Sequence, residues 1–177
     1  MASRRLFVAL RPPQRVCDAL LDTMEGVAGA RWQDADNLHI TLRFIGEVNR
    51  HMFADICTVL STVPFRPFPV RIASVSHFEG KRRPRAIWAA VEGSPALRSL
   101  QNSVEMACRR AGLLPETRKF VPHVTLARLN SASAPIHGWL CTHGDLSLQP
   151  WIVDRFELFE SDVTPQGAIY SSVASFA

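Results

Sequence analysis

Two short segments of the sequence repeat the same four-residue pattern. His39-Ile40-Thr41-Leu42 and His123-Val124-Thr125-Leu126 both read histidine, apolar residue, threonine, leucine, and nearly half the chain separates them. Side chains two apart on a β-strand point to the same face, so each segment presents an imidazole beside a hydroxyl. Two such strands facing each other would gather two histidines and two threonines around one small volume. That arrangement suits acid–base chemistry on a phosphate.

Other interpretations of the repeat stay open at this point. A single histidine on a strand is commonly structural, the pattern H-x-T is short, and weak repeats also arise from duplicated structural halves. Paired histidines are also common metal ligands. However, the sequence has none of the spacings H-x-H, H-E-x-x-H or C-x-x-C, and threonine is a poor zinc ligand. We therefore expect a paired active site that needs neither a metal nor a cofactor.

Length, charge and cysteine usage narrow the class of protein. The 177 residues fit one domain or two small lobes around a shared core. The net charge of +4 is compatible with a polyanionic substrate. Four cysteines without motif spacing indicate free thiols in a reducing compartment. The apolar run Leu6–Leu10 is too short for a signal peptide, and no segment is long enough to span a membrane. We expect a cytoplasmic monomer.

The spacing of apolar residues, prolines and capping side chains predicts an α+β fold. Helices are expected over residues 14–27, 50–60 and 95–111. Strands are expected over residues 4–10, 38–45, 70–77, 85–91, 121–129, 146–160 and 168–176, with a loop or short helix over 131–144. Short turns between neighbouring strands imply antiparallel pairing. Because a β-α-β-type unit occurs twice, we expect two pseudo-symmetric lobes of antiparallel sheet plus helices around a central cleft.

The motifs and their neighbours resemble a known family. The sequence is similar to the bacterial and archaeal RNA 2′,3′-cyclic phosphodiesterases, also called 2′-5′ RNA ligases, within the two-histidine phosphoesterases. The similarity runs from about Arg4 to Phe176 and is carried by Arg5–Leu10, Asn37–Val48, Ile87-Trp88 and Pro122–Arg128. It implies one two-lobed domain over residues 1–177. It also implies metal-independent hydrolysis of a 2′,3′-cyclic phosphate at an RNA end to a 2′-phosphomonoester, with 2′-5′ ligation as the reverse reaction.

The resemblance also assigns roles to individual residues. It implies that His123 accepts a proton from attacking water and that His39 donates one to the departing 3′ oxygen. Thr41 and Thr125 would hold the non-bridging phosphate oxygens. The family arginine five residues after the second histidine is Arg128, which would contact the phosphate or nucleotide. On a regular strand Arg128 would point away from His123, whereas a strand end, a bulge or its long side chain would bring it back. The residues alone do not distinguish acid from base, because the two motifs are nearly identical.

Further candidates and alternatives complete the sequence-based hypothesis. A basic run on a predicted hairpin would contact the RNA backbone, or would simply be a solvated turn; it comprises Lys81, Arg82, Arg83 and Arg85. Phe7 and Trp88 would stack on a base or belong to the core. The same four motif residues would also serve a phosphodiesterase acting on a small cyclic nucleotide or a 2′-5′ oligonucleotide. A non-catalytic module that binds RNA or nucleotides would tolerate the loss of either motif histidine.

Overall fold

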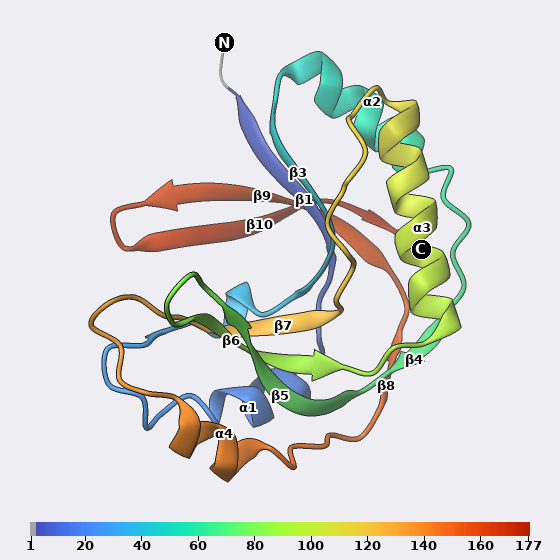
Figure 1. The fold of residues 1–177 in the computed structure, drawn as a ribbon. Helices are drawn as coiled ribbons and strands as arrows, with labels where there is room; N and C mark the ends of the chain where they lie inside the picture. The colour runs from blue at the N-terminus through green and yellow to red at the C-terminus, as the bar shows by residue number, and fades with distance from the viewer. Residues whose placement is uncertain (1–2) are drawn as a thin grey trace.

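The computed structural model describes residues 3–177 and contains a large sheet, a small sheet and four α-helices within that range (Figure 1). In chain order the elements are β1 (Arg4–Leu10), α1 (Gln14–Leu21), β2 (Arg31–Trp32), the 3-10 turn η1 (Ala35–Asn37), β3 (Ile40–Val48), α2 (Arg50–Leu60), β4 (Phe68–Val70), β5 (Ile72–Glu79), β6 (Pro84–Val91), α3 (Pro95–Arg110), β7 (His123–Arg128), α4 (His137–His143), β8 (Trp151–Val153), β9 (Phe156–Thr164) and β10 (Gly167–Phe176).

The large sheet is antiparallel and divides at its centre. Its strand order is β10-β9-β1-β3-β7-β6-β5, and β2 pairs with the outer part of β7. The motif strands β3 and β7 are neighbours, yet they are joined only where Ile40 lies opposite Val124. In contrast, β3 pairs with β1 and β7 pairs with β6 over most of their lengths. The predicted α+β fold is therefore confirmed, with one motif strand at the inner edge of each half.

Helices lie beside both halves of the sheet. Helices α2 and α3 pack against each other, and α3 contacts β3 (Figure 1). Helix α4 contacts β5 of the other half, and α1 contacts η1. Asn49 caps α2 by accepting a hydrogen bond from the Met52 amide, and Ser94 caps α3 through the Leu97 amide. These caps fix the points where the chain leaves one half of the sheet and starts a helix.

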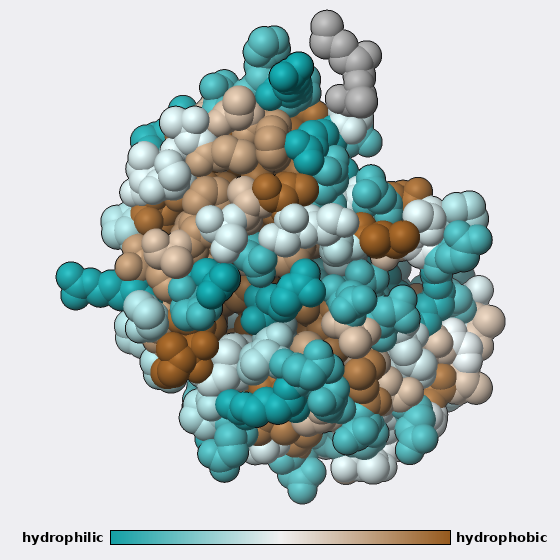
Figure 2. All heavy atoms as spheres, turned by 180° about the vertical axis from the view of Figure 1, so that it is seen from behind, coloured by the Kyte–Doolittle hydropathy of each residue, from teal (hydrophilic) through white to brown (hydrophobic). Residues whose placement is uncertain are grey.

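Apolar side chains of both motif strands lie in the main core. Ile40, Leu42, Val124 and Leu126 are almost fully buried, as alternation along the strands requires. The outer surface is different in character. The face shown in Figure 2 mixes hydrophilic side chains with smaller hydrophobic patches. No helix within residues 3–177 is long and apolar enough to cross a membrane.

The first motif strand is bulged at the leucine of the repeat. Val8 of β1 pairs with Arg43 and Ala9 pairs with Thr41, so Leu42 is an extra residue on β3. A bulge shifts the alternation of side chains by one position. Arg43 is consequently buried, and Phe44 returns to the face that carries Thr41.

The second motif strand has a bulge at the equivalent position. Ile87 of β6 pairs with Ala127 and Trp88 pairs with Thr125, so Leu126 is the extra residue on β7. Leu126 and Ala127 are both buried, while Arg128 is exposed. Because of this bulge, the outward orientation that a regular strand would give Arg128 does not apply, and Arg128 lines the same cleft as His123.

Several element boundaries differ from those predicted. Helix α1 ends at Leu21, and residues 22–29 form turns that include Gly26 at φ +80°. The strand expected over residues 146–160 is two strands, because Trp151 and Val153 are buried in the small sheet and an exposed Asp154-Arg155 pair follows. The ambiguous segment 131–144 contains the short helix α4.

A glycine close to the first motif keeps β3 in this bulged path. Gly46 has φ +89°, and a Cβ there would meet only the Phe44 ring at 3.6 Å, so backbone strain is the main cost of substitution. We predict that Gly46→Ala lowers the free energy of unfolding by about 1–2 kcal/mol. Gly93→Ala is the matched control because Gly93 has open space and no positive φ; it should change stability by less than about 0.5 kcal/mol. Equal effects in urea unfolding would contradict this account.

Candidate active site

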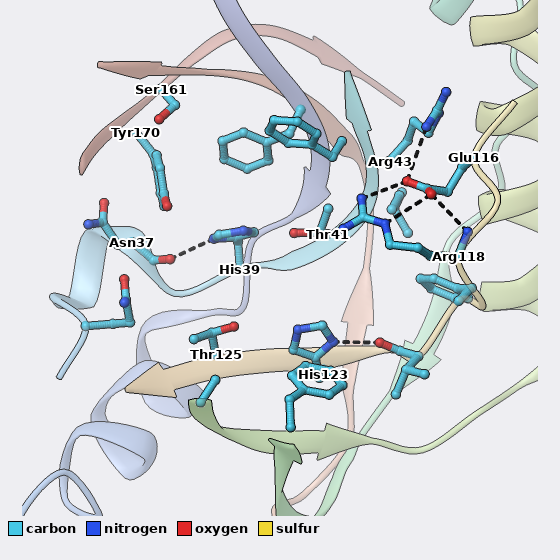
Figure 3. Close-up of a pocket in the computed structure, with 18 of the residues that line it drawn as sticks. Asn37, His39, Thr41, Arg43, Glu116, Arg118, His123, Thr125, Ser161 and Tyr170 are labelled. Atoms are coloured by element: carbon cyan, nitrogen blue, oxygen red, sulfur yellow. Dashed lines mark hydrogen bonds and ion pairs between the residues drawn. The ribbon is translucent and has the colours of Figure 1, made fainter. Parts of the chain in front are cut away.

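The two halves of the sheet enclose a cleft of about 650 Å³ that both motifs line (Figure 3). Its lining includes His39, Thr41, His123, Thr125 and Arg128. Because β3 and β7 are antiparallel and Ile40 lies opposite Val124, the motifs face each other head to tail. The structure therefore brings together all five residues that the sequence placed at the phosphate.

The two imidazoles are held in the same way. The Nδ1 atom of His39 lies 2.7 Å from the carbonyl oxygen of Asn37, and Nδ1 of His123 lies 2.6 Å from that of Val121. A carbonyl oxygen can only accept a hydrogen bond, so Nδ1 carries the proton in both rings. The Nε2 atom of each neutral ring is then an unprotonated base. Asn37 is itself tied to β10, because its side-chain amide donates to the Ala168 carbonyl at 2.8 Å.

Aromatic rings from neighbouring strands support each histidine. The His39 ring contacts both Phe7 of β1 and Tyr170 of β10, with ring centroids 4.8 Å and 5.2 Å away, and these two rings also contact each other. The His123 ring contacts Phe78 of β5 at 4.9 Å and Trp88 of β6 at 5.5 Å. Phe7 is buried and packs on Phe159, so it belongs to the core that holds His39. These contacts restrict the ring orientations on both sides of the cleft.

Burial makes both histidines weak bases in the empty cleft. The pKa of His39 is lowered to about 4, mainly by loss of hydration; the bond to Asn37 opposes this effect, and the positive charges of His123, Arg11 and Arg128 add to it. The pKa of His123 is also lowered, mainly by burial and in part by Arg128. Both rings are therefore mostly neutral near pH 7. A bound phosphate would raise both pKa values, because its negative charge favours imidazolium.

Thr41, Thr125 and Arg128 add hydrogen-bond donors to the cleft. Thr41 and Thr125 are partly exposed in the cleft, and within residues 3–177 neither hydroxyl makes a hydrogen bond. They are thus free to donate to a ligand oxygen. The guanidinium of Arg128 is exposed on the same lining, beyond Thr125. Hydroxyls and a guanidinium converging on one volume make a site for an anion such as a phosphate.

The basic run on the β5–β6 hairpin is only partly at the cleft. Arg85 lines it and lies over the Phe78 ring, 5.5 Å from the centroid. Lys81, Arg82 and Arg83 are exposed on the turn and do not line the cleft. The structure therefore separates Arg85 from the other members of the run.

Several lining residues were not predicted. Tyr170, the single tyrosine of the chain, comes from β10, and Asn37 from the turn before the first motif. Arg118 comes from the segment before β7 and points back toward the cleft (Figure 3). Its sequence neighbours, Lys119 and the second motif, were the available indication that this basic segment lies near the site.

The donor set around the histidines contains few metal ligands. No group of three or more His, Cys, Asp or Glu side chains lies together in the part of the chain from residue 3 to 177. The carboxylate that lines the cleft, Glu116, is paired with Arg118 and Arg43. The cleft thus presents imidazoles, hydroxyls and guanidiniums to a ligand.

Together the fold and the cleft define a class of two-lobed α+β proteins with one H-x-T motif on the inner strand of each lobe. A family model described as the 2′-5′ RNA ligase superfamily matches residues 12–165. This chain belongs to that superfamily.

Curated relatives match over most of the chain. The RNA 2′,3′-cyclic phosphodiesterase of Archaeoglobus fulgidus is 31% identical over 175 residues, covering 97% of this chain and 99% of the relative. The protein of the same name from Aeropyrum pernix is 36% identical over 141 residues, covering 78% of this chain and 80% of the relative.

Solved structures share the fold. The protein TT0787 of Thermus thermophilus superposes with a TM-score of 0.77 at 26% identity, covering 97% of this chain and 96% of that one. Escherichia coli LigT, solved as a complex with 3′-AMP, has a TM-score of 0.78 at 21% identity, covering 98% of this chain and 97% of that one.

Proposed function

We propose that this protein hydrolyses 2′,3′-cyclic phosphate ends of RNA to 2′-phosphomonoesters without a metal. The observation that carries the proposal is the pair of imidazoles with Nδ1 protonated, facing each other across the cleft beside two free hydroxyls. The curated relatives named RNA 2′,3′-cyclic phosphodiesterase support the substrate, since they match 97% and 78% of this chain.

The chemistry needs a base and an acid on opposite sides of phosphorus. We assign the base to His123, whose Nε2 takes a proton from water as the water oxygen bonds to phosphorus. The bond from phosphorus to the 3′ oxygen then breaks, and Nε2–H of His39 protonates that oxygen. A low intrinsic pKa suits His39 to this task, because an imidazolium that is protonated only beside the bound phosphate releases its proton readily.

The remaining cleft residues hold the phosphate. We assign the Thr41 and Thr125 hydroxyls to the non-bridging oxygens, where they orient phosphorus for in-line attack. Arg128 adds positive charge on the side of Thr125, where charge develops on those oxygens. Of the hairpin arginines, Arg85 is placed to contact the RNA backbone at the cleft, while Arg82 and Arg83 would do so only outside it.

The same residues would also serve two related reactions. In the reverse reaction, a 5′ hydroxyl of RNA would take the place of water and form a 2′-5′ bond. A small cyclic nucleotide would use the same four motif residues, and product analysis separates it from RNA. We also propose that the chain acts as one monomeric domain in the cytoplasm, which agrees with its four free cysteines.

The first test of function is a direct assay in chelator. An RNA oligonucleotide ending in a 2′,3′-cyclic phosphate should be opened to a 2′-phosphate in the presence of excess EDTA, because the proposed groups are all side chains of the protein. Phosphorus NMR identifies the product isomer. Activity that is lost in EDTA and returns with Zn²⁺, Mg²⁺ or Mn²⁺ would refute the metal-free mechanism.

The second test removes one histidine at a time. His39→Ala and His123→Ala should each lower kcat by about 10²-fold or more, the scale of a positioned acid or base. The double variant should lose far less than the product of the two effects, because the pair acts as a unit. His51→Ala is the matched control, since His51 is exposed at the start of α2 and outside the cleft lining.

Turnover close to that of the wild type in either single variant would remove that histidine from the mechanism. If both single variants kept their turnover and still bound RNA, the protein would be a binding module. Thermal unfolding of each variant shows whether a loss of activity is due to loss of the fold.

A further inference from the structure

The chain reaches the second motif through a segment without regular structure. Residues 111–122 connect α3 to β7 and form no helix or strand. Within the described residues 3–177, no backbone group from Leu114 to Val121 bonds to another backbone group. This segment nevertheless carries the Val121 carbonyl, which accepts the hydrogen bond from Nδ1 of His123 at 2.6 Å.

The peptide that carries the Val121 carbonyl has no N–H of its own, because the next residue is Pro122. The end of the segment is tied to β6, since the Val91 amide donates to the Pro122 carbonyl at 3.2 Å. The position of the Val121 carbonyl itself therefore depends on what holds the residues before it.

The anchor of the first motif histidine, in contrast, is fixed locally. The Asn37 carbonyl, which bonds to His39, belongs to a peptide whose N–H is that of Leu38. This amide donates to the Ala35 carbonyl at 3.2 Å within η1. The equivalent peptide before His123 lacks such a bond, so the two pseudo-symmetric halves differ in how they hold their imidazoles.

A buried arginine of the first motif strand holds the start of the segment. Because of the bulge at Leu42, only 8% of Arg43 is exposed. Its Nη2 donates to the Leu114 carbonyl, and its Nη1 lies 3.4 Å from the Glu116 carboxylate (Figure 3). Arg43 thus joins β3 to the segment that leads to β7.

Two carboxylates complete a cluster around Arg43. Oε2 of Glu105 on α3 lies 2.7 Å from Nε of Arg43, and Oε1 of Glu105 accepts a hydrogen bond from the Glu116 amide at 3.1 Å. Hydrogen bonds from the Arg118 side chain lower the pKa of Glu116 to about 2, so its carboxylate stays ionised wherever the histidines are neutral. Each guanidinium nitrogen of Arg43 therefore has an oxygen partner within the protein.

We propose that Arg43 is a positioning residue for His123. Together with Glu105 and Glu116 it holds residues 114–121, so that the Val121 carbonyl keeps His123 in the Nδ1–H form and leaves its Nε2 free to accept a proton. Since Arg43 belongs to the strand of the first motif, it also fixes the second imidazole relative to the first. The catalytic part of this role rests on the proposed function, whereas the tautomer is a property of the protein without substrate.

Two variants break this connection to different extents. Replacing Arg43 alone would leave two carboxylates without their buried cation, which is strongly destabilising. The triple variant Arg43→Met, Glu105→Gln, Glu116→Gln removes the cluster without leaving an unpaired charge in the interior. Glu116→Ala is milder, because Arg43 keeps Glu105 and the Leu114 carbonyl as partners.

Nitrogen NMR of the isotope-labelled protein measures the tautomer directly, because protonated and unprotonated ring nitrogens resonate far apart. Near about pH 8, where imidazoles are neutral, the wild type should show the Nδ1–H form for both His39 and His123. The triple variant should convert roughly half or more of His123 to the Nε2–H form and leave His39 unchanged. Glu116→Ala should cause the same change to a smaller extent. His39→Ala and His123→Ala assign the signals.

Turnover gives a second measure of the same role. On RNA with a cyclic phosphate end, the triple variant should lower kcat by about tenfold to 10²-fold, the scale of a misplaced catalytic group. KM should change by less than about threefold, because the guanidinium of Arg43 has no free donor for the substrate.

The chain offers a matched control in another ion pair of the sheet. Arg4 of β1 donates to the Glu160 carboxylate at 2.9 Å and 2.6 Å, and the pair is partly buried but lies outside the cleft lining. Arg4→Met combined with Glu160→Gln should leave both tautomers and kcat as they are in the wild type.

A folded triple variant that kept His123 in the Nδ1–H form would overturn the positioning role. Loss of this form at His39 and His123 together would also overturn it, because that result would indicate a general loosening of the cleft. Thermal unfolding shows whether the triple variant is folded, and if it is not, Glu116→Ala decides by the same criteria.

The NMR measurement separates failure of the positioning role from failure of the proposed function, because it needs no turnover. A tautomer change confined to His123, in a protein whose wild type opened no cyclic phosphate, would support the positioning role and refute the proposed reaction. An active enzyme whose His123 tautomer did not respond to either variant would do the reverse.

Discussion

The cleft exists because the motif strands β3 and β7 pair with each other at a single position and not along their lengths. The two strands share the single bridge between Ile40 and Val124, and both residues are fully buried. The bridge fixes the register, so each histidine of one motif lies across from the threonine of the other. Beyond it β3 pairs with β1 and β7 pairs with β6 on their outer edges, while β2 pairs with the inner edge of β7 at Ala127 and Arg128. A longer ladder would close the space that the substrate needs, and no bridge would leave the register undefined.

A second constraint is the local anchor on each imidazole. Both Nδ1 atoms bond to a carbonyl two residues back in the chain, so the ring orientation is set by the strand's own backbone. Burial then keeps both rings mostly neutral until an anion enters. The pseudo-symmetry supplies two equivalent groups, and the cleft has a direction because Phe44 and Arg128, each three residues beyond its motif threonine, differ in kind.

Much of this arrangement could be predicted from the sequence, because the repeat and its alternation of polar and apolar residues are local features. The strand positions of both motifs and the extent of α2 follow from such patterns. The sequence left the orientation of Arg128 open between a regular strand and a bulge, since the bulge at Leu126 appears only in the pairing with β6. The position of Tyr170 in the cleft could not be predicted, because its contact with His39 joins residues that are far apart in the sequence. The spacing of apolar residues would allow helix α1 to continue to Val27. In the folded protein the helix ends at Leu21, and residues 22–29 form turns instead.

The central claim is that one imidazole must be neutral and the other protonated in the same complex, and the pH dependence of kcat tests it most directly. With saturating cyclic-phosphate RNA, the account predicts a bell-shaped profile. Protonation of the base removes activity on the acid side, and deprotonation of the acid removes it on the alkaline side. Both apparent pKa values belong to the coupled pair and should lie above those of the free cleft, because the phosphate favours imidazolium. Residual activity of His39→Ala or His123→Ala should lose one limb of the bell. A rate that rises steadily to high pH would contradict the account, because it would identify hydroxide or metal-bound water as the nucleophile.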